Sequence, residues 1–96
     1  MKEMNASELK ELIDSGKDIF LLDVREKEEI DIGLIDGYTM IPLDQVENNL
    51  DKIPKDKQVV VYCMSGGRSA HITEFLESKG YDNVFNLSGG IMSWIG

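Results

Sequence analysis

Short apolar runs separated by segments of helical length constrain the fold of this chain more than any other feature. Three runs stand out, at residues 19–22, 59–62 and 84–87. The second is β-branched and aromatic, which makes it the strongest strand signal in the sequence. Strands that alternate with helix-length segments pair in parallel through right-handed crossovers. We therefore predict an α/β fold with a central, mostly parallel sheet and helices on both faces.

The segments between these runs carry helix signals. Asn5 and Glu8 have the spacing of a capping box, which predicts a helix over residues 6–14 that Gly16 ends. Apolar spacing predicts further helices at residues 26–32, at residues 43–50, and from Ser69 to Gly80, where the glycine ends the helix. Turn residues set off a strand at residues 39–41, which Pro42 ends. A short helix that contains Trp94 is predicted after Gly89 and Gly90. Ligands of parallel sheets bind where the strands end, so residues that follow strands are the first candidates for chemistry.

Length and composition favour one self-folding domain over residues 1–96. The 96 residues are 42% hydrophobic and 29% charged, a balance that argues against disorder and against a membrane protein. No repeat, low-complexity tract or linker-like stretch divides the chain. The formal charge is -8 and the basic residues are scattered, which argues against nucleic acid and anionic membranes as partners.

The sequence also predicts a cytoplasmic location. The longest apolar stretch, residues 19–22, is far shorter than the about 20 residues of a membrane-spanning helix, and the first ten residues lack the apolar core of a signal peptide. Cys63 is the only cysteine in the sequence, so it cannot form an internal disulfide. An unpaired cysteine in a small protein suits a reducing compartment.

The most informative segment lies between the strongest strand and a predicted helix. It consists of Cys63, Met64, Ser65, Gly66, Gly67, Arg68 and Ser69. The two glycines allow successive N–H groups to turn inward, and the following helix adds the positive end of its dipole, so the loop stabilises an anion at its centre. A thiol at that place, beside an arginine, has a lowered pKa. We therefore expect Cys63 to be a thiolate nucleophile.

Four segments, taken in order, resemble a single rhodanese domain and cover nearly the whole chain. They are residues 21–26 (LLDVRE), residues 33–43 ending in Ile-Pro-Leu, residues 63–69, and residues 80–94 with Gly80-Tyr81 and the run from Leu87 to Ile91. The resemblance implies a three-layer fold and sulfurtransferase activity. In that family a loop cysteine takes a sulfane sulfur from a donor, holds it as a persulfide and passes it to an acceptor. By this resemblance Cys63 is the sulfur carrier.

The same resemblance implies roles for the residues around Cys63. The loop from Met64 to Ser69 supplies hydrogen-bond donors, and Arg68 lowers the thiolate pKa and attracts an anionic donor such as thiosulfate. Asp23 and Arg25 resemble a structural pair at a strand end. The implied partners are thiosulfate or a persulfide as donor and a thiol, cyanide or a protein thiol as acceptor. No cofactor or metal is expected.

One segment departs from the family pattern. Where the family commonly has Gly-His-Ile-Pro-Gly-Ala, this chain has Gly33, Leu34, Ile35, Asp36, Gly37 and Tyr38. The absent histidine removes a polar contact, and Tyr38 replaces a small residue with a bulky one. We expect altered packing at the rim of the site and an unchanged fold.

Three other functions stay open at this point. Cysteine phosphatases and arsenate reductases have a similar loop with five residues between cysteine and arginine, whereas this loop has four, and Tyr62 stands where phosphatases commonly have histidine. A non-catalytic binding module is compatible with the same fold. A redox sensor that forms a sulfenic acid on Cys63 would need an external thiol to resolve it. His71 is expected to be a surface residue instead of a base.

Overall fold

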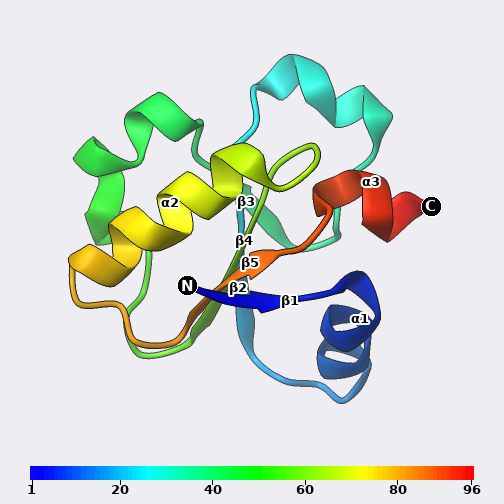
Figure 1. The fold of residues 1–96 in the computed structure, drawn as a ribbon, viewed down its shortest axis with the longest axis horizontal. Helices are drawn as coiled ribbons and strands as arrows, with labels where there is room; N and C mark the ends of the chain where they lie inside the picture. Colours follow the sequence, from blue (N-terminus) through cyan, green and yellow to red (C-terminus); the bar gives the residue numbers. More distant parts are fainter.

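The computed structural model describes residues 1–96 and contains one five-stranded sheet in which every neighbouring pair is parallel (Figure 1). The strands are β1 (Lys2–Met4), β2 (Ile19–Asp23), β3 (Tyr38–Met40), β4 (Gln58–Tyr62) and β5 (Val84–Leu87), in the order β1-β5-β4-β2-β3. This confirms the α/β class. Because all strands are parallel, their carboxyl ends meet at one edge of the sheet.

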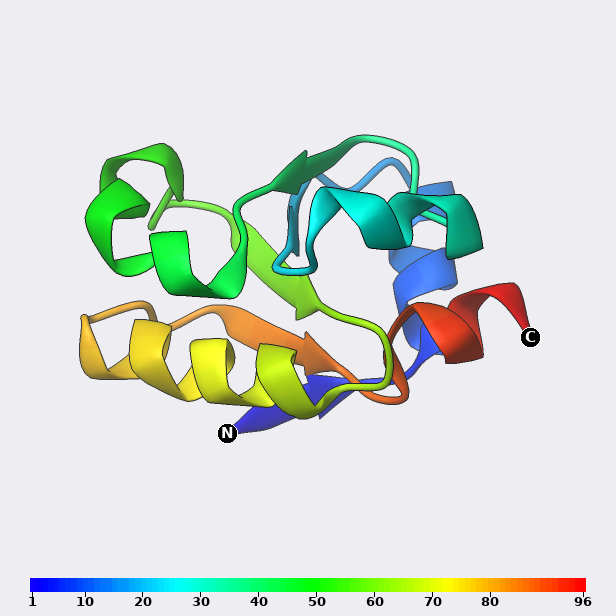
Figure 2. The same ribbon diagram turned by 90° about the horizontal axis from the view of Figure 1, so that it is seen from above.

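Helices cover both faces of the sheet, as expected for parallel strands. The α-helices are α1 (Ala6–Asp14), α2 (Gly67–Ser78) and α3 (Gly90–Ile95), and the 3-10 helices are η1 (Lys27–Ile32), η2 (Leu43–Gln45) and η3 (Glu47–Lys52). Figure 1 shows α2, η2 and η3 on one side of the sheet and α1 on the other. Figure 2 shows that the loop between β4 and α2 lies next to the start of α3.

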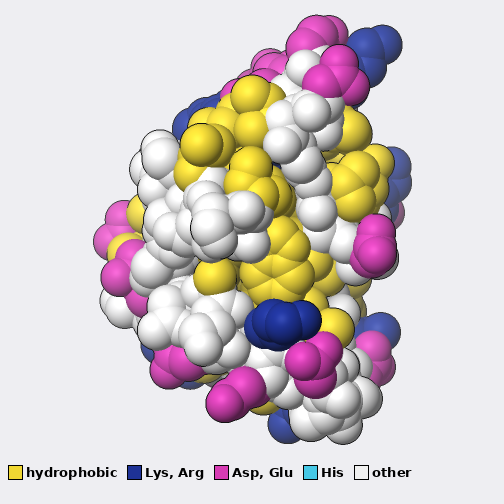
Figure 3. All heavy atoms as spheres, turned by 90° about the vertical axis from the view of Figure 1, so that its right-hand side faces the viewer, with side chains coloured by type: hydrophobic (Ala, Val, Ile, Leu, Met, Phe, Trp, Pro, Cys, Tyr) yellow, Lys and Arg dark blue, Asp and Glu magenta, His cyan; other side chains and the backbone are white.

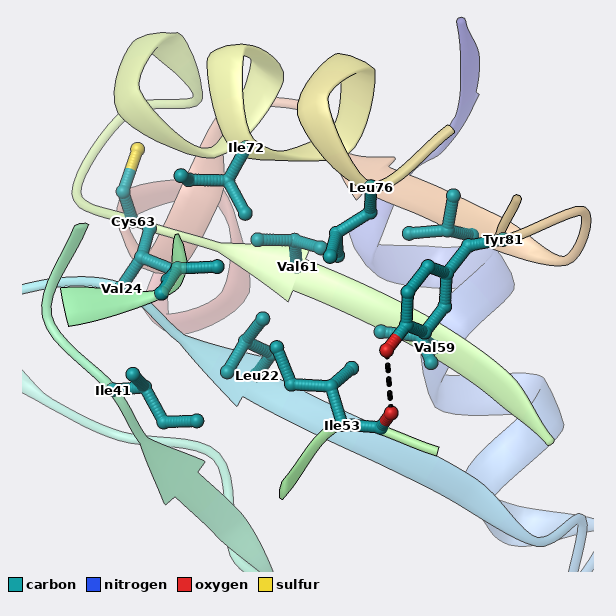
Figure 4. Packing of buried hydrophobic residues seen from close by; sticks show 12 residues of the cluster. Leu22, Val24, Ile41, Ile53, Val59, Val61, Cys63, Ile72, Leu76 and Tyr81 are labelled. Carbon is teal, nitrogen blue, oxygen red and sulfur yellow. Dashed lines mark hydrogen bonds between the residues drawn. The ribbon is translucent and has the colours of Figure 1, made fainter. Parts of the chain in front are cut away.

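Two hydrophobic clusters fill the spaces between the sheet and these helices. The cluster under α2, η2 and η3 includes Cys63 at one end and Tyr81 at the other (Figure 4). The Tyr81 hydroxyl donates a hydrogen bond to the Ile53 carbonyl oxygen over 2.6 Å. The cluster on the opposite face includes Leu9 of α1 and Ile91 of α3. Cys63 therefore stands at the margin of a packed core, with its sulfur shielded from water.

The predicted capping box is present at the start of α1. The Asn5 side chain accepts a hydrogen bond from the Glu8 N–H over 2.8 Å, and the Glu8 side chain accepts one from the Asn5 N–H over 2.8 Å. Two otherwise unpaired N–H groups are thereby satisfied. Gly16, with a φ of +80°, follows the end of the helix in the left-handed conformation that glycine favours.

The structure differs from the sequence prediction in the shorter elements. The helix predicted at residues 26–32 is the 3-10 helix η1, and the helical spacing at residues 43–50 corresponds to two 3-10 helices, η2 and η3. Strand β1 was not predicted, because Lys-Glu-Met has neither β-branched residues nor alternation. It exists because it pairs with β5 at the far end of the chain.

The face that carries α3 exposes apolar side chains at its centre, with charged side chains around them (Figure 3). Ile32 of η1 and Met92 and Ile95 of α3 are each about half exposed, at 49%, 48% and 48%. A Cβ on Gly33 would lie 2.9 Å from the Ile95 side chain. The end of η1 and α3 therefore pack against each other beside the loop that follows β4.

Candidate active site

The sulfur of Cys63 accepts hydrogen bonds from the loop that follows it. Cys63 comes directly after β4, and its side chain points toward the start of α2 (Figure 4). The N–H groups of Gly66 and Ser69 donate to Sγ over 3.2 Å and 3.4 Å, and the Ser69 hydroxyl donates over 3.3 Å. The residue is only 1% exposed. The predicted inward turn of the loop is therefore present, with the sulfur at its centre.

These contacts set the ionisation of the thiol. Burial raises the pKa of Cys63, but hydrogen bonds from the Ser69 hydroxyl and from the N–H groups of Ser69, Gly66 and Ser65 lower it more, so the pKa lies below its ordinary value. Donors that face an anion favour the charged form of a group. The thiolate is the form that attacks electrophilic sulfur. The site therefore stabilises a nucleophile.

Gly66 allows the loop to close around the sulfur. Its φ is +111°, in the left-handed region that glycine favours, and it is the residue from which α2 begins. A Cβ at this position would lie 3.4 Å from the Gly89 nitrogen, so the turn is also closely packed. Ser69 is the third residue of α2 and not its cap, which leaves its hydroxyl free to donate to Cys63.

Helix α3 orients the peptide groups of the same loop. The N–H groups of Ile91 and Met92 donate to the carbonyl oxygens of Cys63 and Met64 over 2.9 Å and 3.1 Å. In a planar trans peptide the N–H points opposite to the carbonyl. With the Met64 carbonyl turned toward α3, the Ser65 N–H points away from α3, and it contributes to the lowered pKa of Cys63. The first turn of α3 thus orients the Cys63 and Met64 carbonyl groups toward α3 and the Ser65 N–H away from it.

Gly90 makes this close approach possible. A Cβ there would lie 2.5 Å from the Met64 carbonyl oxygen and 2.6 Å from that of Cys63, and its φ is +59°. Distances this short do not occur between a Cβ and a carbonyl oxygen. Gly90 therefore allows α3 to come close enough to donate to the loop carbonyls.

Asp23 and Arg25 form a fully buried ion pair at the end of β2. Arg25 Nη2 lies 2.9 Å from Asp23 Oδ2, and neither side chain is exposed. Arg25 also donates to the carbonyl oxygens of Glu29 over 3.1 Å and Gly33 over 2.8 Å. The pair has the predicted bracing geometry, since Arg25 holds the middle of η1 and the residue that follows it.

Arg68 forms an ion pair with Glu29 and makes no hydrogen bond to the sulfur of Cys63. Its Nη1 donates to Glu29 Oε2 over 2.9 Å and its Nη2 donates to Glu29 Oε1 over 2.8 Å. The hydrogen bonds that lower the pKa of Cys63 come from loop N–H groups and Ser69 instead. Sequence reasoning missed Glu29, because 39 residues separate it from Arg68. The only feature of the sequence that pointed to Glu29 was its position in the acidic segment that follows Arg25.

The other predicted residues lie around this centre. Ser65 and Gly67 are exposed, and Met64 is half-buried against the cluster that contains Ile91. His71 is exposed, as expected. In the departing segment Leu34 and Tyr38 are half-buried, and Tyr38 packs on the same cluster as Met64. None of the residues from Cys63 to Ser69 lines one of the four surface hollows. The hollow whose lining comes nearest to this loop in sequence includes His71 and Ile72.

No group of three or more His, Cys, Asp or Glu side chains has an arrangement that could hold a metal ion. None of the helices has the length and apolar character needed to cross a lipid bilayer.

Fold and site together define a class of protein, an α/β domain that presents a hydrogen-bonded cysteine sulfur at the carboxyl end of a parallel sheet. The chain belongs to the rhodanese-like domain family, whose model matches residues 5–96. It is 35% identical to a sulfurtransferase of Allochromatium vinosum over 98% of this chain and 88% of that protein. It is also 35% identical to the putative sulfurtransferase YtwF of Bacillus subtilis, over 100% and 92% of the two chains.

A solved structure has the same fold. The rhodanese-like domain protein from Staphylococcus aureus superimposes with a TM-score of 0.90 at 35% identity, and the match covers 98% of this chain and 91% of that one. The protein is therefore a rhodanese-like member of a sulfurtransferase family.

Proposed function

We propose that the protein transfers a sulfane sulfur atom through a persulfide on Cys63. The observation that carries this proposal is the convergence of donors from Gly66 and Ser69 on the Cys63 sulfur. The terminal sulfur of a persulfide bears negative charge, so preorganised donors of this kind stabilise the intermediate as well as the attacking thiolate. The relatives named sulfurtransferase support the reaction class.

The transfer has two steps, both balanced without an oxidant. In the first, the Cys63 thiolate attacks the outer sulfur of thiosulfate, a bond to that sulfur forms, the sulfur–sulfur bond of thiosulfate breaks, and sulfite leaves with the electron pair. In the second, cyanide or a thiolate attacks the terminal sulfur of the persulfide. Thiocyanate or a new persulfide is released and the Cys63 thiolate returns.

The acceptor is proposed to be a small thiol or a protein thiol, with cyanide as a laboratory substitute. The sulfur follows β4, and Cys63 lines none of the four surface hollows, which supports an acceptor that brings its own nucleophile to the site over a small molecule held in a deep pocket. A thiol that must stay reduced between cycles suits the cytoplasm, where we place the protein.

Intact-protein mass spectrometry after incubation with thiosulfate tests the proposal. We expect a gain of one sulfur atom that cyanide or a thiol removes, and no gain in Cys63→Ser. Serine keeps the size of the side chain and the contacts of the loop, so circular dichroism should show the same fold. A wild-type protein that gains no sulfur, or a variant that still gains it, would exclude the mechanism. Hydrolysis of a phosphatase substrate by wild type alone would favour the phosphatase alternative.

A further inference from the structure

The ion pair between Arg68 and Glu29 carries an inference about which sulfur donor the site accepts. Both terminal nitrogens of Arg68 donate to the two oxygens of Glu29, over 2.8 Å and 2.9 Å. This is the bidentate geometry in which arginine and carboxylate bind most strongly. The side chains are 38% and 24% exposed, so the pair is partly shielded from water. Arg68 is therefore engaged before any donor arrives.

Glu29 is held in place independently of Arg68. Its Oε2 accepts the N–H of Glu26 over 2.8 Å in a capping box, and its own carbonyl accepts a hydrogen bond from Arg25. Arg25 in turn is paired with the buried Asp23. Because the carboxylate is already ordered, Glu29 loses little additional freedom when Arg68 pairs with it. The pKa of Glu29 is lowered to about 2, chiefly by the hydrogen bond from Arg68, so the pair is charged at any physiological pH.

The engaged pair changes the electrostatics of the loop. Arg68 is the only charged residue between Cys63 and Ser69, and Glu29 balances its charge. Attack on thiosulfate brings a thiolate together with a dianion, and sulfite leaves as a dianion. Attack on a thiol persulfide brings a thiolate together with a monoanion, and a monoanionic thiolate leaves. A loop whose cation is neutralised disfavours the first reaction more than the second.

We propose that Glu29 determines donor specificity by keeping Arg68 away from anionic donors, so that the site takes sulfur from thiol persulfides in preference to thiosulfate. This inference rests on the sulfur transfer proposed above. In the preferred step the Cys63 thiolate attacks the outer sulfur of the donor persulfide. A new sulfur–sulfur bond forms on Cys63, the bond in the donor breaks, and the donor thiolate leaves with the electron pair.

Glu29→Gln tests the inference, with Glu28→Gln as the matched control. Glutamine keeps an oxygen that can accept the Glu26 N–H but loses the charge that holds Arg68. Glu28 is exposed, lies on the same helix, and its replacement removes the same charge. The second-order rate constant of Cys63 persulfidation is measured by mass spectrometry with thiosulfate and with cysteine persulfide as the two donors.

We expect Glu29→Gln to raise the thiosulfate rate constant about tenfold and to leave the persulfide rate constant within about twofold, the size expected when one charged hydrogen bond is freed. Glu28→Gln should change neither by more than about twofold. Adding Arg68→Ala to Glu29→Gln should abolish the gain, because the freed cation is what binds the dianion. Glu29→Ala is a second neutral variant if Glu29→Gln does not fold.

Three outcomes would overturn the inference while leaving sulfur transfer intact. They are an unchanged ratio of the two rate constants in Glu29→Gln, a fall in thiosulfate use in that variant, and an equal gain in Glu28→Gln. A wild-type protein that gains no sulfur from either donor would instead contradict the proposed function itself, and the inference with it.

Discussion

At the scale of single residues, hydrogen bonds from the Ser69 hydroxyl and from loop N–H groups are the largest contributions that lower the pKa of the Cys63 sulfur. Ser69 contributes twice, through its hydroxyl and its N–H, and both contacts lower the pKa of Cys63. Arg68 has its hydrogen bonds with Glu29 instead. The hydroxyl of Ser69 is thus the side chain that most directly controls how much thiolate is present.

Ser69→Ala should therefore raise the pKa of Cys63. Loss of the hydroxyl donor removes stabilisation from the thiolate and none from the thiol, so the thiolate fraction falls at any pH below the new pKa. At pH values below the wild-type pKa we expect alkylation of Cys63 by iodoacetamide to slow by about threefold to tenfold, as for one lost hydrogen bond to a charged group. The pH profile of the alkylation rate should move to higher pH.

Ser78→Ala serves as the control, because the Ser78 hydroxyl lies on the same helix and donates only to the Phe75 carbonyl. Its profile should match wild type. Coincident profiles for Ser69→Ala and wild type would mean that the Ser69 hydroxyl does not stabilise the thiolate.

Local spacing predicted the loop from Cys63 to Ser69 but not the partner of Arg68. Cys63 was identifiable because two glycines and an arginine follow it within a few positions. The pair between Glu29 and Arg68 was not, since it depends on how η1 is placed beside α2 in three dimensions. The contact of Ser69 with the sulfur arises because the loop turns back at Gly66, a geometry that residue types alone do not specify.

At the scale of elements, α3 completes the active-site loop. Its first turn donates to the carbonyls of Cys63 and Met64, and Gly90 allows that approach. Gly90→Ala should therefore displace the loop as well as strain the backbone. We expect a loss of about 2 to 4 kcal/mol in the free energy of unfolding, measured with urea, and slower alkylation of Cys63.

Gly37→Ala is the control that separates the backbone strain in Gly90→Ala from the steric clash of its Cβ with the loop. Gly37 has a φ of +88° but no atom within 4 Å of an added Cβ, so its replacement introduces the left-handed alanine without the clash. We expect a cost of about 1 to 2 kcal/mol and unchanged alkylation. If the two variants behaved alike, the contact between α3 and the loop would have no part in the reactivity of Cys63.

Elements with strong local signals were predictable, and elements held by distant contacts were not. The run at residues 59–62 and the capping box at Asn5 predicted β4 and α1 because their sequence patterns agree with their final environment. Strand β1 has no such pattern and exists through its pairing with β5. The segment at residues 43–50 has helical spacing, but it follows Pro42 and is interrupted at Asn49, whose backbone is not helical.

At the scale of the whole molecule, net charge should oppose anionic donors. The formal charge is -8 on a body of 32 × 30 × 21 Å. At about 0.01 M salt the Debye length is about 30 Å and spans the molecule, whereas at about 0.15 M it is about 8 Å. We expect the rate of persulfidation by thiosulfate to rise about twofold to fivefold over this range, measured by mass spectrometry at pH 7.

Alkylation by iodoacetamide, which is uncharged, uses the same thiolate and should change little over the same range of salt. A thiosulfate rate that falls with salt would show that a local cation, and not the total charge, dominates the approach of the donor.

The dependence of the loop on α3 also bears on how the protein is made. A ribosome adds residues in order, and the carbonyls of Cys63 and Met64 find their donors only when Ile91 and Met92 have emerged. Until then the thiol has been translated but the donors of α3 have not. A nascent or prematurely terminated chain that stops before α3 would carry the cysteine without the two donors that orient the Cys63 and Met64 carbonyls.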